Sequence, residues 1–319
     1  MALTGPSPDS VASVLPGTDM SDVHRTPPAF ASANGLKLCY DTFGDRSSAP
    51  LLLIMGLAAQ MTAWDDEFCT LLAGRGYHVV RFDNRDIGLS SRIESAGVPD
   101  VGAAFMAAMQ GKPIPSPPYL LTDMANDAVG LLDALGIDTA HVVGASMGGA
   151  IVQTLAIHHP QRLRTVTSIM ATTGEPGLPP PTADAMAVLF KPTPSEPAAY
   201  YESYAQTWKV LRAGSSPLDE ARDLTRARQN FERGLNPAGV ARQLVAILAS
   251  GSRKPALGAV RVPFLVIHGD IDPLVPLACG LDTAESVPGA KLLVIPGMGH
   301  ALPIAKWPQI VDAIAAHAV

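Results

Sequence analysis

The chain has 319 residues, 47% of them hydrophobic, which is enough to bury the core of one sizeable α/β domain with an insertion. Its net charge of −6 provides no basic patch, so nucleic acid is not an expected partner. Three cysteines (Cys39, Cys69 and Cys279) are too few and too scattered for a disulfide framework or a zinc site. No apolar run approaches the roughly 20 residues that cross a bilayer, and residues 1–28 lack the basic start and apolar stretch of a signal peptide. We therefore expect a soluble, cytoplasmic protein without a membrane span.

The first elements predict a sheet that opens with a hairpin. Residues 1–28 are rich in Pro, Ser, Asp and Gly and are predicted to form a flexible tail. Strand-like residues 29–32 and 36–42 flank Asn34-Gly35, a strong hairpin signal. Strands and helices then alternate, which predicts an α/β fold with a mostly parallel sheet flanked by helices. The predicted elements are a strand at 50–55, a helix at 61–75, a strand at 77–83, a helix at 122–135 with Thr122 or Asp123 as N-cap, a strand at 139–144, a helix at 148–159, and strands at 163–171, 262–269 and 290–296.

The alternation breaks between residues 174 and 260, where a Pro-rich stretch is followed by several helical segments. We predict a helical cap here, inserted into an α/β core made of residues 29–173 and 261–319. A cap over the strand ends would exclude water and shape an apolar acyl or alcohol pocket. Residues 93–121 interrupt the alternation of strands and helices a second time, and this segment is predicted to form another wall of the pocket. The cap helices are expected at 183–190, 197–211, 218–233 and 237–250.

Residues 144–149 (GASMGG) follow the apolar run 141–143 and place Ser146 between small residues, where a strand turns sharply into a helix. This pattern is typical of a nucleophile elbow. Side chains two positions before and after the serine would collide in such a turn, which explains Gly144 and Gly148. Because Gly-x-Ser-x-Gly also occurs by chance in Gly-rich loops, the interpretation depends on the partners of Ser146.

A candidate base and a candidate carboxylate follow Ser146 in the chain order that this fold requires. His300 lies in the loop after the strand 290–296, and Asp270 and Asp272 follow the strand 262–269. A serine hydroxyl is a weak nucleophile, so an imidazole must take its proton and a carboxylate must orient the ring.

The orienting carboxylate has two candidates. The spacing from Gly269 favours Asp272, and Asp270 is the second choice. The remaining histidines are predicted to be structural, with those near the termini solvated: His24, His78, His141, His158, His159, His268 and His317.

Acyl transfer also needs donors for the oxyanion, which on this fold are backbone N–H groups. One belongs to the residue after the nucleophile, here Met147. The other is expected in the loop after the strand 50–55, where the residue after Gly56 is Leu57.

Four motifs together resemble the α/β-hydrolase superfamily over roughly residue 29 to the C-terminus: 55–57 (MGL), 83–90 (DNRDIGLS), 144–149 (GASMGG) and 297–300 (GMGH). The run 83–90 and the ending GMGHALP are most similar to the branch that contains aclacinomycin methylesterase. One departure is Met55, which stands where relatives often carry a histidine before the glycine.

The resemblance implies ester hydrolysis through an acyl-enzyme, without a metal or an organic cofactor. Ser146 would attack, His300 would move the proton, and Asp272 would orient His300, while Leu57 and Met147 would bind the oxyanion. The expected substrate is a small or medium carboxylic ester, and the methyl ester of a bulkier apolar acid is one candidate. Two alternatives stay open: a lactonase or cofactor-free perhydrolase with the same triad, and, less favoured because the triad is complete, a non-catalytic binding protein of this fold.

Overall fold

The structure is a computed structural model of the chain that describes residues 23–114, 116–214 and 216–319. The strands of this part form one eight-stranded sheet in the order β1-β2-β4-β3-β5-β6-β7-β8. The pairs β1–β2 and β2–β4 are antiparallel, and the pairs from β4 through β8 are parallel. The strands are β1 (Ala29–Ala33), β2 (Leu36–Phe43), β3 (Ala49–Ile54), β4 (Tyr77–Phe82), β5 (Ala140–Ala145), β6 (Leu163–Ile169), β7 (Phe264–Gly269) and β8 (Lys291–Ile295).

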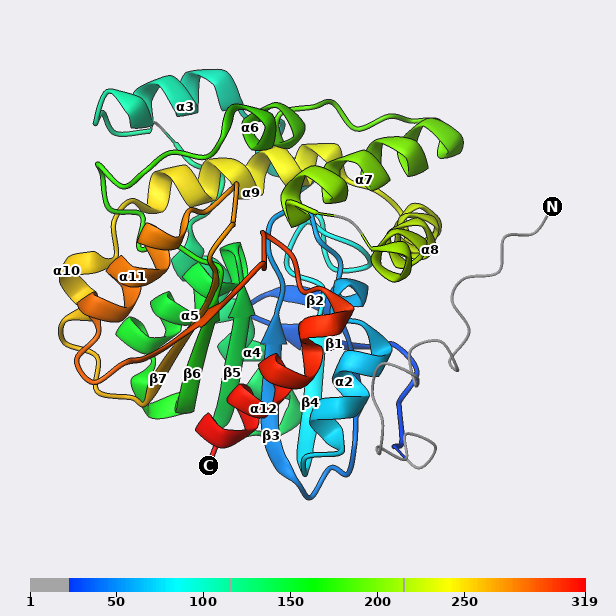
Figure 1. Cartoon of the computed structure of the whole chain (residues 1–319), viewed down its shortest axis with the longest axis vertical. Coiled ribbons are helices and arrows are strands. Elements are labelled where there is room, and N and C mark those ends of the chain that lie inside the picture. The colour runs from blue at the N-terminus through cyan, green and yellow to red at the C-terminus, as the bar shows by residue number, and fades with distance from the viewer. Residues whose placement is uncertain (1–22, 115, 215) are drawn as a thin grey trace.

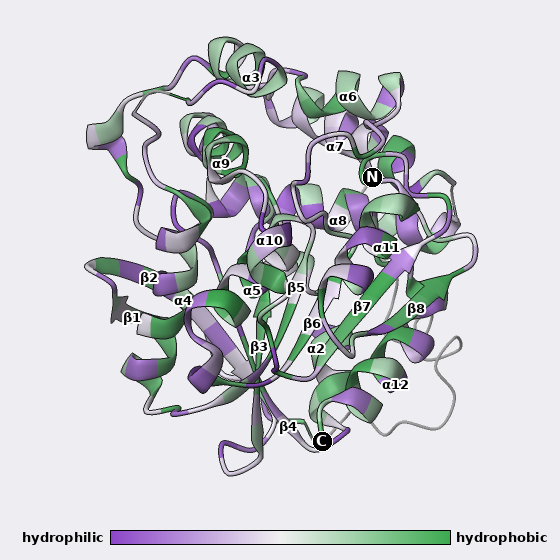
Figure 2. Cartoon of the chain, turned by 90° about the vertical axis from the view of Figure 1, so that its left-hand side faces the viewer, coloured by the Kyte–Doolittle hydropathy of each residue, from purple (hydrophilic) through white to green (hydrophobic). Residues whose placement is uncertain are grey.

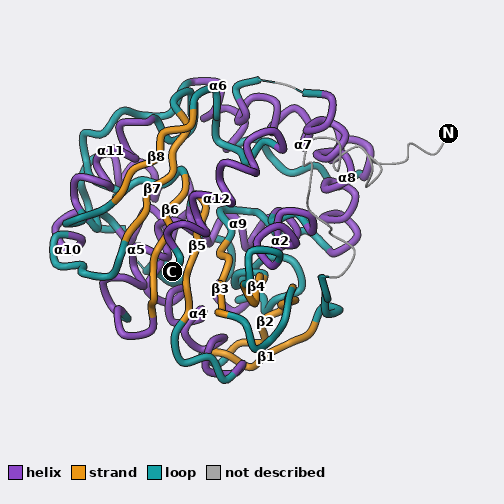
Figure 3. Tube along the Cα trace, turned by 60° about the horizontal axis from the view of Figure 1, so that its bottom comes forward, coloured by secondary structure: helices purple, strands orange, loops and turns teal. Residues whose placement is uncertain are grey.

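Helices cover both faces of the sheet (Figure 1, Figure 3). The residues of β3 alternate between the two hydrophobic clusters: Leu52 and Ile54 pack on one face, and Leu51 and Leu53 pack on the other. Because the central strands are buried on both sides, they are nearly continuous apolar runs, and β5 and β7 are largely green in Figure 2. The face of Leu52 is covered by α4 (Leu121–Leu135), α5 (Met147–His158) and α11 (Leu277–Ser286), and the face of Leu51 by α2 (Asp66–Ala73) and α12 (Trp307–His317).

A layer of helices lies across one end of the sheet, above the strands in Figure 1. It contains α3 (Val101–Met109), α6 (Ala183–Leu189), α7 (Pro197–Arg212), α8 (Pro217–Arg233) and α9 (Pro237–Ser250). Helix α3 comes from the segment 93–121 and packs against α9. The layer therefore draws on two separate parts of the chain. The short helix α10 (Lys254–Leu257) and 3₁₀ turns at Met61–Ala63, Glu94–Ala96, Pro160–Arg162 and Ile304–Lys306 complete the described elements.

The chain enters and leaves the long insertion at neighbouring points. The N–H of Arg253 donates to the carbonyl of Thr173 at 2.8 Å. The guanidinium of Arg253 also donates to the carbonyls of Thr172, at 2.8 Å, and Gly251, at 3.2 Å. The two ends are thus bonded to each other beside the sheet.

The predicted helix at 61–75 is wrong over its first five residues. A 3₁₀ turn at Met61–Ala63 precedes α2, which begins only at Asp66. The N–H of Met61 donates to the buried carboxylate of Asp83 at 2.7 Å, and Trp64 is fully buried. Tertiary contacts therefore override the helical pattern of this segment.

The predicted N-cap of α4 is also wrong. The helix begins at Leu121, and the Asp123 carboxylate accepts a hydrogen bond from the N–H of Leu120 at 2.7 Å. Asp123 therefore acts from the first turn of the helix, as the acidic residue of a capping box does. The predicted end of the helix at Gly136 is confirmed, since this residue has φ 70°.

Residues 23–28 belong to the folded structure, although we expected them in the tail. The N–H of Thr26 donates to the carbonyl of Thr42 at 3.0 Å, and Gly44 donates to His24 at 2.9 Å. Arg25 bonds the carboxylate of Asp41 at 3.1 Å. The rest of the predicted tail, residues 1–22, lies outside the described residues. Within the described ranges, no helix combines the length and the apolar character needed to cross a membrane.

Candidate active site

Ser146 occupies a strained turn between β5 and α5, with φ 56° and ψ −119°. This is a left-handed conformation that non-glycine residues rarely adopt. A Cβ on Gly144 would overlap the carbonyl of Gly148, and a Cβ on Gly148 would overlap the carbonyl of Ile54. The small residues of the motif therefore allow the serine to stand at the tip of the turn.

His300, in the loop after β8, reaches Ser146 from 154 positions away in the chain. Its Nε2 lies 2.9 Å from the Ser146 Oγ, and its Nδ1 lies 2.8 Å from the Asp272 Oδ2. Both His300 and Asp272 are buried, and Ser146 is half-buried. The three predicted residues thus form one hydrogen-bonded chain, with the geometry of a nucleophile, its base and an orienting carboxylate.

Asp272 and Asp270 have different environments. The Oδ1 of Asp272 accepts from the N–H groups of Leu274 and Val275 at 2.9 and 2.8 Å. Asp270 is exposed, and its carboxylate accepts from the N–H of Gly297 at 2.6 Å. The structure therefore brings Asp272 to His300, while Asp270 fastens the loop that carries the histidine.

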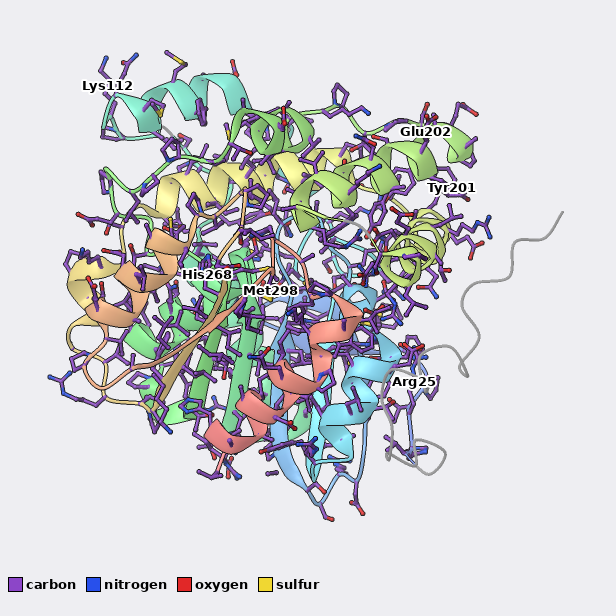
Figure 4. The ribbon with its side chains drawn as sticks, in the orientation of Figure 1. Arg25, Lys112, Tyr201, Glu202, His268 and Met298 are labelled. Carbon is purple, nitrogen blue, oxygen red and sulfur yellow. The ribbon has the colours of Figure 1, made fainter. Side chains whose placement is uncertain are left out.

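A second imidazole, that of His268, lies behind Asp272. Its side chain is fully buried, and its Nε2 is 2.7 Å from the carbonyl of Val275 and 3.8 Å from the Asp272 carboxylate. Within the described residues its Nδ1 has no hydrogen-bond partner. Burial lowers the pKa of His268, so Asp272 faces a neutral ring on this side. Figure 4 labels His268 and Met298 below the cap layer, near the upper ends of the strands.

One expectation about the other histidines is wrong. His317 is buried rather than solvated, with its Nε2 3.2 Å from the carbonyl of Val166. His24 is exposed, as expected. His141 is buried and contacts the hydroxyl of Thr165 at 2.9 Å.

The loop after β3 lies against the elbow. A Cβ on Gly56 would stand 2.9 Å from the Cβ of Ser146, so only glycine allows this approach. Leu57 follows in the same loop, and Met147 is the first residue of α5. The N–H of Met147 belongs to the first turn of the helix, where such groups have no partner within the helix. Met147 therefore follows Ser146 directly in the chain, and Leu57 follows the glycine that packs against Ser146.

A buried polar cluster that we did not predict ties the loop after β4 to helices α8 and α9. Asp86, fully buried, accepts two hydrogen bonds from Arg242 of α9 at 2.8 and 2.6 Å and one from the Tyr119 hydroxyl at 2.9 Å. Asp83 of the same loop pairs with Arg233 of α8. The available signal was the charged run 83–90 directly after a buried strand.

The same cluster reaches the loop that carries Leu57. Asn84 donates to the carbonyl of Met55 at 2.9 Å, and Gln243 of α9 accepts from the N–H of Ala58 at 3.2 Å. Helix α9 and the loops after β3 and β4 are thus joined by hydrogen bonds. Among the described residues, no group of three or more His, Cys, Asp or Glu side chains could hold a metal ion.

The chain is similar to known proteins over most of its length. Residues 49–306 match the family described as the alpha/beta hydrolase fold. The chain is 32% identical to rhodomycin D methylesterase of Streptomyces sp. (strain C5) over 91% of its length and 98% of the relative, and 33% identical to that of Streptomyces peucetius over 86% and 92%. The predicted resemblance to a methylesterase branch is confirmed by these relatives.

Solved structures give the same fold. 2-Hydroxy-6-oxo-6-phenylhexa-2,4-dienoate hydrolase from Rhodococcus sp. strain RHA1 superimposes with a TM-score of 0.72 at 21% identity, covering 92% of this chain and 99% of that one. The predicted fold class is therefore confirmed, and so is the prediction of a carboxylic ester hydrolase. The chain belongs to the alpha/beta hydrolase fold family.

Proposed function

We propose that Ser146, His300 and Asp272 are the nucleophile, the base and the orienting carboxylate of this serine ester hydrolase. The observation that carries the proposal is the hydrogen-bonded chain from Ser146 Oγ through His300 to Asp272, with distances of 2.9 and 2.8 Å. The position of the half-buried Ser146 at the tip of a strained turn gives an ester carbonyl access to the hydroxyl.

The reaction follows from the positions of these groups. Ser146 Oγ attacks the ester carbonyl as His300 Nε2 takes its proton, and the N–H groups of Leu57 and Met147 stabilise the oxyanion. The intermediate then collapses to an acyl-enzyme, and His300 gives the proton to the departing alkoxide. Water, deprotonated by His300, attacks the acyl-enzyme and releases the acid and Ser146.

We propose the methyl ester of a bulky apolar acid as the substrate class. The support is the likeness to two rhodomycin D methylesterases, which the chain matches over nearly their whole length. In this proposal, residues 174–260 are a cap that shapes the acyl pocket above core segments 29–173 and 261–319. A cytoplasmic location fits the three buried free thiols of Cys39, Cys69 and Cys279.

A panel of p-nitrophenyl esters of increasing acyl length tests the nucleophile. Ser146→Ala should lower kcat by about 10³-fold or more while the unfolding temperature stays within a few degrees. Ser168→Ala is the matched control, because Ser168 is a buried serine on the neighbouring strand β6. Equal activity of Ser146→Ala and the wild type would exclude Ser146 as nucleophile.

The substrate class needs a second comparison. Methyl and ethyl esters of the same bulky aromatic acid, and a lactone of similar size, are assayed by acid release. The proposal expects the highest kcat/KM for the methyl ester. A preference for the lactone would favour a lactonase instead.

A further inference from the structure

Gln243 joins two site loops through one buried side chain. It lies in α9, in the layer above the sheet (Figure 1), and is fully buried. Its Oε1 accepts from the N–H of Ala58 at 3.2 Å, and its Nε2 donates to the carbonyl of Arg85 at 2.9 Å. An amide offers both an acceptor and donors, so this one residue holds the loop after β3 to the loop after β4.

The bonded N–H adjoins the residue that we propose as an oxyanion donor. The peptide group that contains the Ala58 N–H directly follows the peptide group that contains the Leu57 N–H. The two groups are joined at the Leu57 Cα, so the orientation of one constrains the orientation of the other. Ala58 has φ 62°, a conformation that is unfavourable for a residue with a Cβ. The surrounding contacts must therefore hold this part of the backbone in place.

The loop is fixed on both sides of Ala58 by other contacts. The carbonyl of Met55 accepts from Asn84 at 2.9 Å, and the N–H of Met61 donates to Asp83 at 2.7 Å. Gln243 is bonded to the stretch between these two anchors, where Leu57 lies. Loss of the Gln243 bond would leave the Ala58 N–H without this partner and loosen that stretch, which keeps the weaker hydrogen bond from the N–H of Ala59 to the carbonyl of Gly56 at 3.3 Å, while the loop as a whole stays attached.

The helix that carries Gln243 is itself held firmly. Arg242 binds Asp86 through two hydrogen bonds, at 2.8 and 2.6 Å, and the Asn236 amide donates to the carbonyl of Asp86 at 2.9 Å. A Cβ on Gly239 would overlap that same carbonyl, so the helix lies directly on the loop. Gln243 thus extends from a fixed support.

We propose that Gln243 is a positioning residue, which sets the orientation of the Leu57 N–H for the oxyanion through its hydrogen bond to Ala58. The inference rests on the proposed function, because it assumes acyl transfer at Ser146. It makes a helix of the cap layer part of the catalytic apparatus and gives it a role beyond covering the substrate.

Such a residue affects the transition state more than substrate binding. Removing one oxyanion donor costs about 10²–10³-fold in kcat. Misorienting the Leu57 N–H should cost less, about ten- to a hundredfold in kcat, with KM changed by less than about twofold.

The experiment compares Gln243→Met with the wild type on p-nitrophenyl butyrate, measuring kcat, KM and the rate of the acylation burst. Ser250→Ala is the matched control, because the Ser250 hydroxyl of α9 also accepts a backbone hydrogen bond from the core, from the N–H of Leu121 at 2.9 Å, and this bond does not involve the loop that carries Leu57. Gln243→Met should lower kcat and the burst rate, and Ser250→Ala should change neither. Gln243→Glu, which keeps an acceptor for Ala58, should recover part of the loss.

If Gln243→Met does not fold, Gln243→Ala, whose vacated space admits water, carries the same expectation. A Gln243 variant with the kcat of Ser250→Ala, or with a raised KM and unchanged kcat, would overturn the inference while the proposed function stands. A wild-type protein without turnover on the ester panel would overturn the proposed function and the inference together.

Discussion

The main-chain N–H of His300 donates a hydrogen bond to the carbonyl of Leu211, the penultimate residue of α7, at 2.7 Å. A Cβ on the preceding Gly299 would overlap the carbonyl of Arg212, so the two segments touch along their backbones. The loop that carries His300, the proposed base, is therefore held by the layer of helices across the end of the sheet, as the loop with Leu57 is held by α9. In the proposed mechanism, the geometry on both sides of Ser146 thus depends on helices outside the sheet.

The first prediction separates the two carboxylates. Asp272→Asn should lower kcat by about 10²–10⁴-fold, because His300 loses the negative partner that orients it and stabilises its charged form. Asp270→Asn, which changes only the bond to the N–H of Gly297, should stay within about fivefold of the wild type. Steady-state kinetics on one ester decides this, and equal losses would contradict the assignment of Asp272.

The second prediction concerns the space around the elbow. Gly148→Ala should destabilise the protein by about 2–4 kcal/mol and lower activity, because the new methyl group would overlap the carbonyl of Ile54. Gly102→Ala is the control: its Cβ would lie 3.4 Å from Asp100 within helix α3, where alanine favours the helix by about 0.5–1 kcal/mol. Urea unfolding measures both, and equal stability of the two variants would contradict the packing argument.

The third prediction is a loss of stability in mild acid. Burial, with smaller contributions from Arg164 and His317, lowers the pKa of His141 to about 4 from its model-peptide value of 6.5. Below pH 6.5 the unfolded chain therefore binds a proton at residue 141 that the folded chain does not bind. The contribution of the neutral His141 to stability is complete above pH 6.5 and is lost as the pH falls from 6.5 toward 4. The free energy of unfolding of His141→Gln should accordingly fall less between pH 7.5 and 5 than that of the wild type.

Urea unfolding at pH 7.5 and pH 5 gives the free energy of unfolding of each protein. The change in this free energy between the two pH values is compared, because the substitution also removes the contact with Thr165 at both. His158→Gln is the control, because this exposed residue ends α5 at the surface. An identical pH dependence in wild type and His141→Gln would refute the prediction.

The fourth prediction tests the buried pair between Asp86 and Arg242. Burial opposes ionisation of Asp86, but hydrogen bonds from Arg242, the Ile93 N–H and the Tyr119 hydroxyl outweigh it and hold its pKa below the usual value. Arg242→Met should cost about 3–5 kcal/mol, because it leaves a buried carboxylate without its cation. The double variant with Asp86→Asn should recover part of that loss.

Arg75→Met is the matched control, since the Arg75–Asp312 pair is exposed, and it should cost less than about 1 kcal/mol. Denaturant unfolding of the wild type, the two single variants Asp86→Asn and Arg242→Met, and the double variant completes the cycle. Additive losses from Asp86→Asn and Arg242→Met would show that the pair is not coupled.

The elements that the sequence predicts well are those whose geometry is local. The hairpin at Asn34-Gly35 has φ 48° and 76° at these residues, which is the conformation their types favour. Gly144 and Gly148 likewise predict a turn in which larger side chains do not fit. In both cases the residue type itself encodes the backbone conformation.

Contacts across the chain were not predictable in this way. Gln243 lies in a mostly apolar helix, and its partners Ala58 and Arg85 are 185 and 158 positions away. The same holds for the segment at Met61–Ala63, whose shape depends on the distant Asp83. The polar pair Arg242-Gln243 within α9 was the only local sign that this helix meets polar groups of the core.

The bonded ends of the long insertion, Thr173 and Arg253, have an evolutionary consequence. Because these two residues are hydrogen-bonded to each other, the segment between them is an insertion whose ends lie together beside the sheet. Each doubling of the length of such an inserted segment costs only about 0.6 kcal/mol in closure entropy. Descendants of this chain can therefore change the length of α6 and of the segment that leads into α7 without moving the strands of the sheet, as long as the end of α7 keeps its hydrogen bond to the N–H of His300.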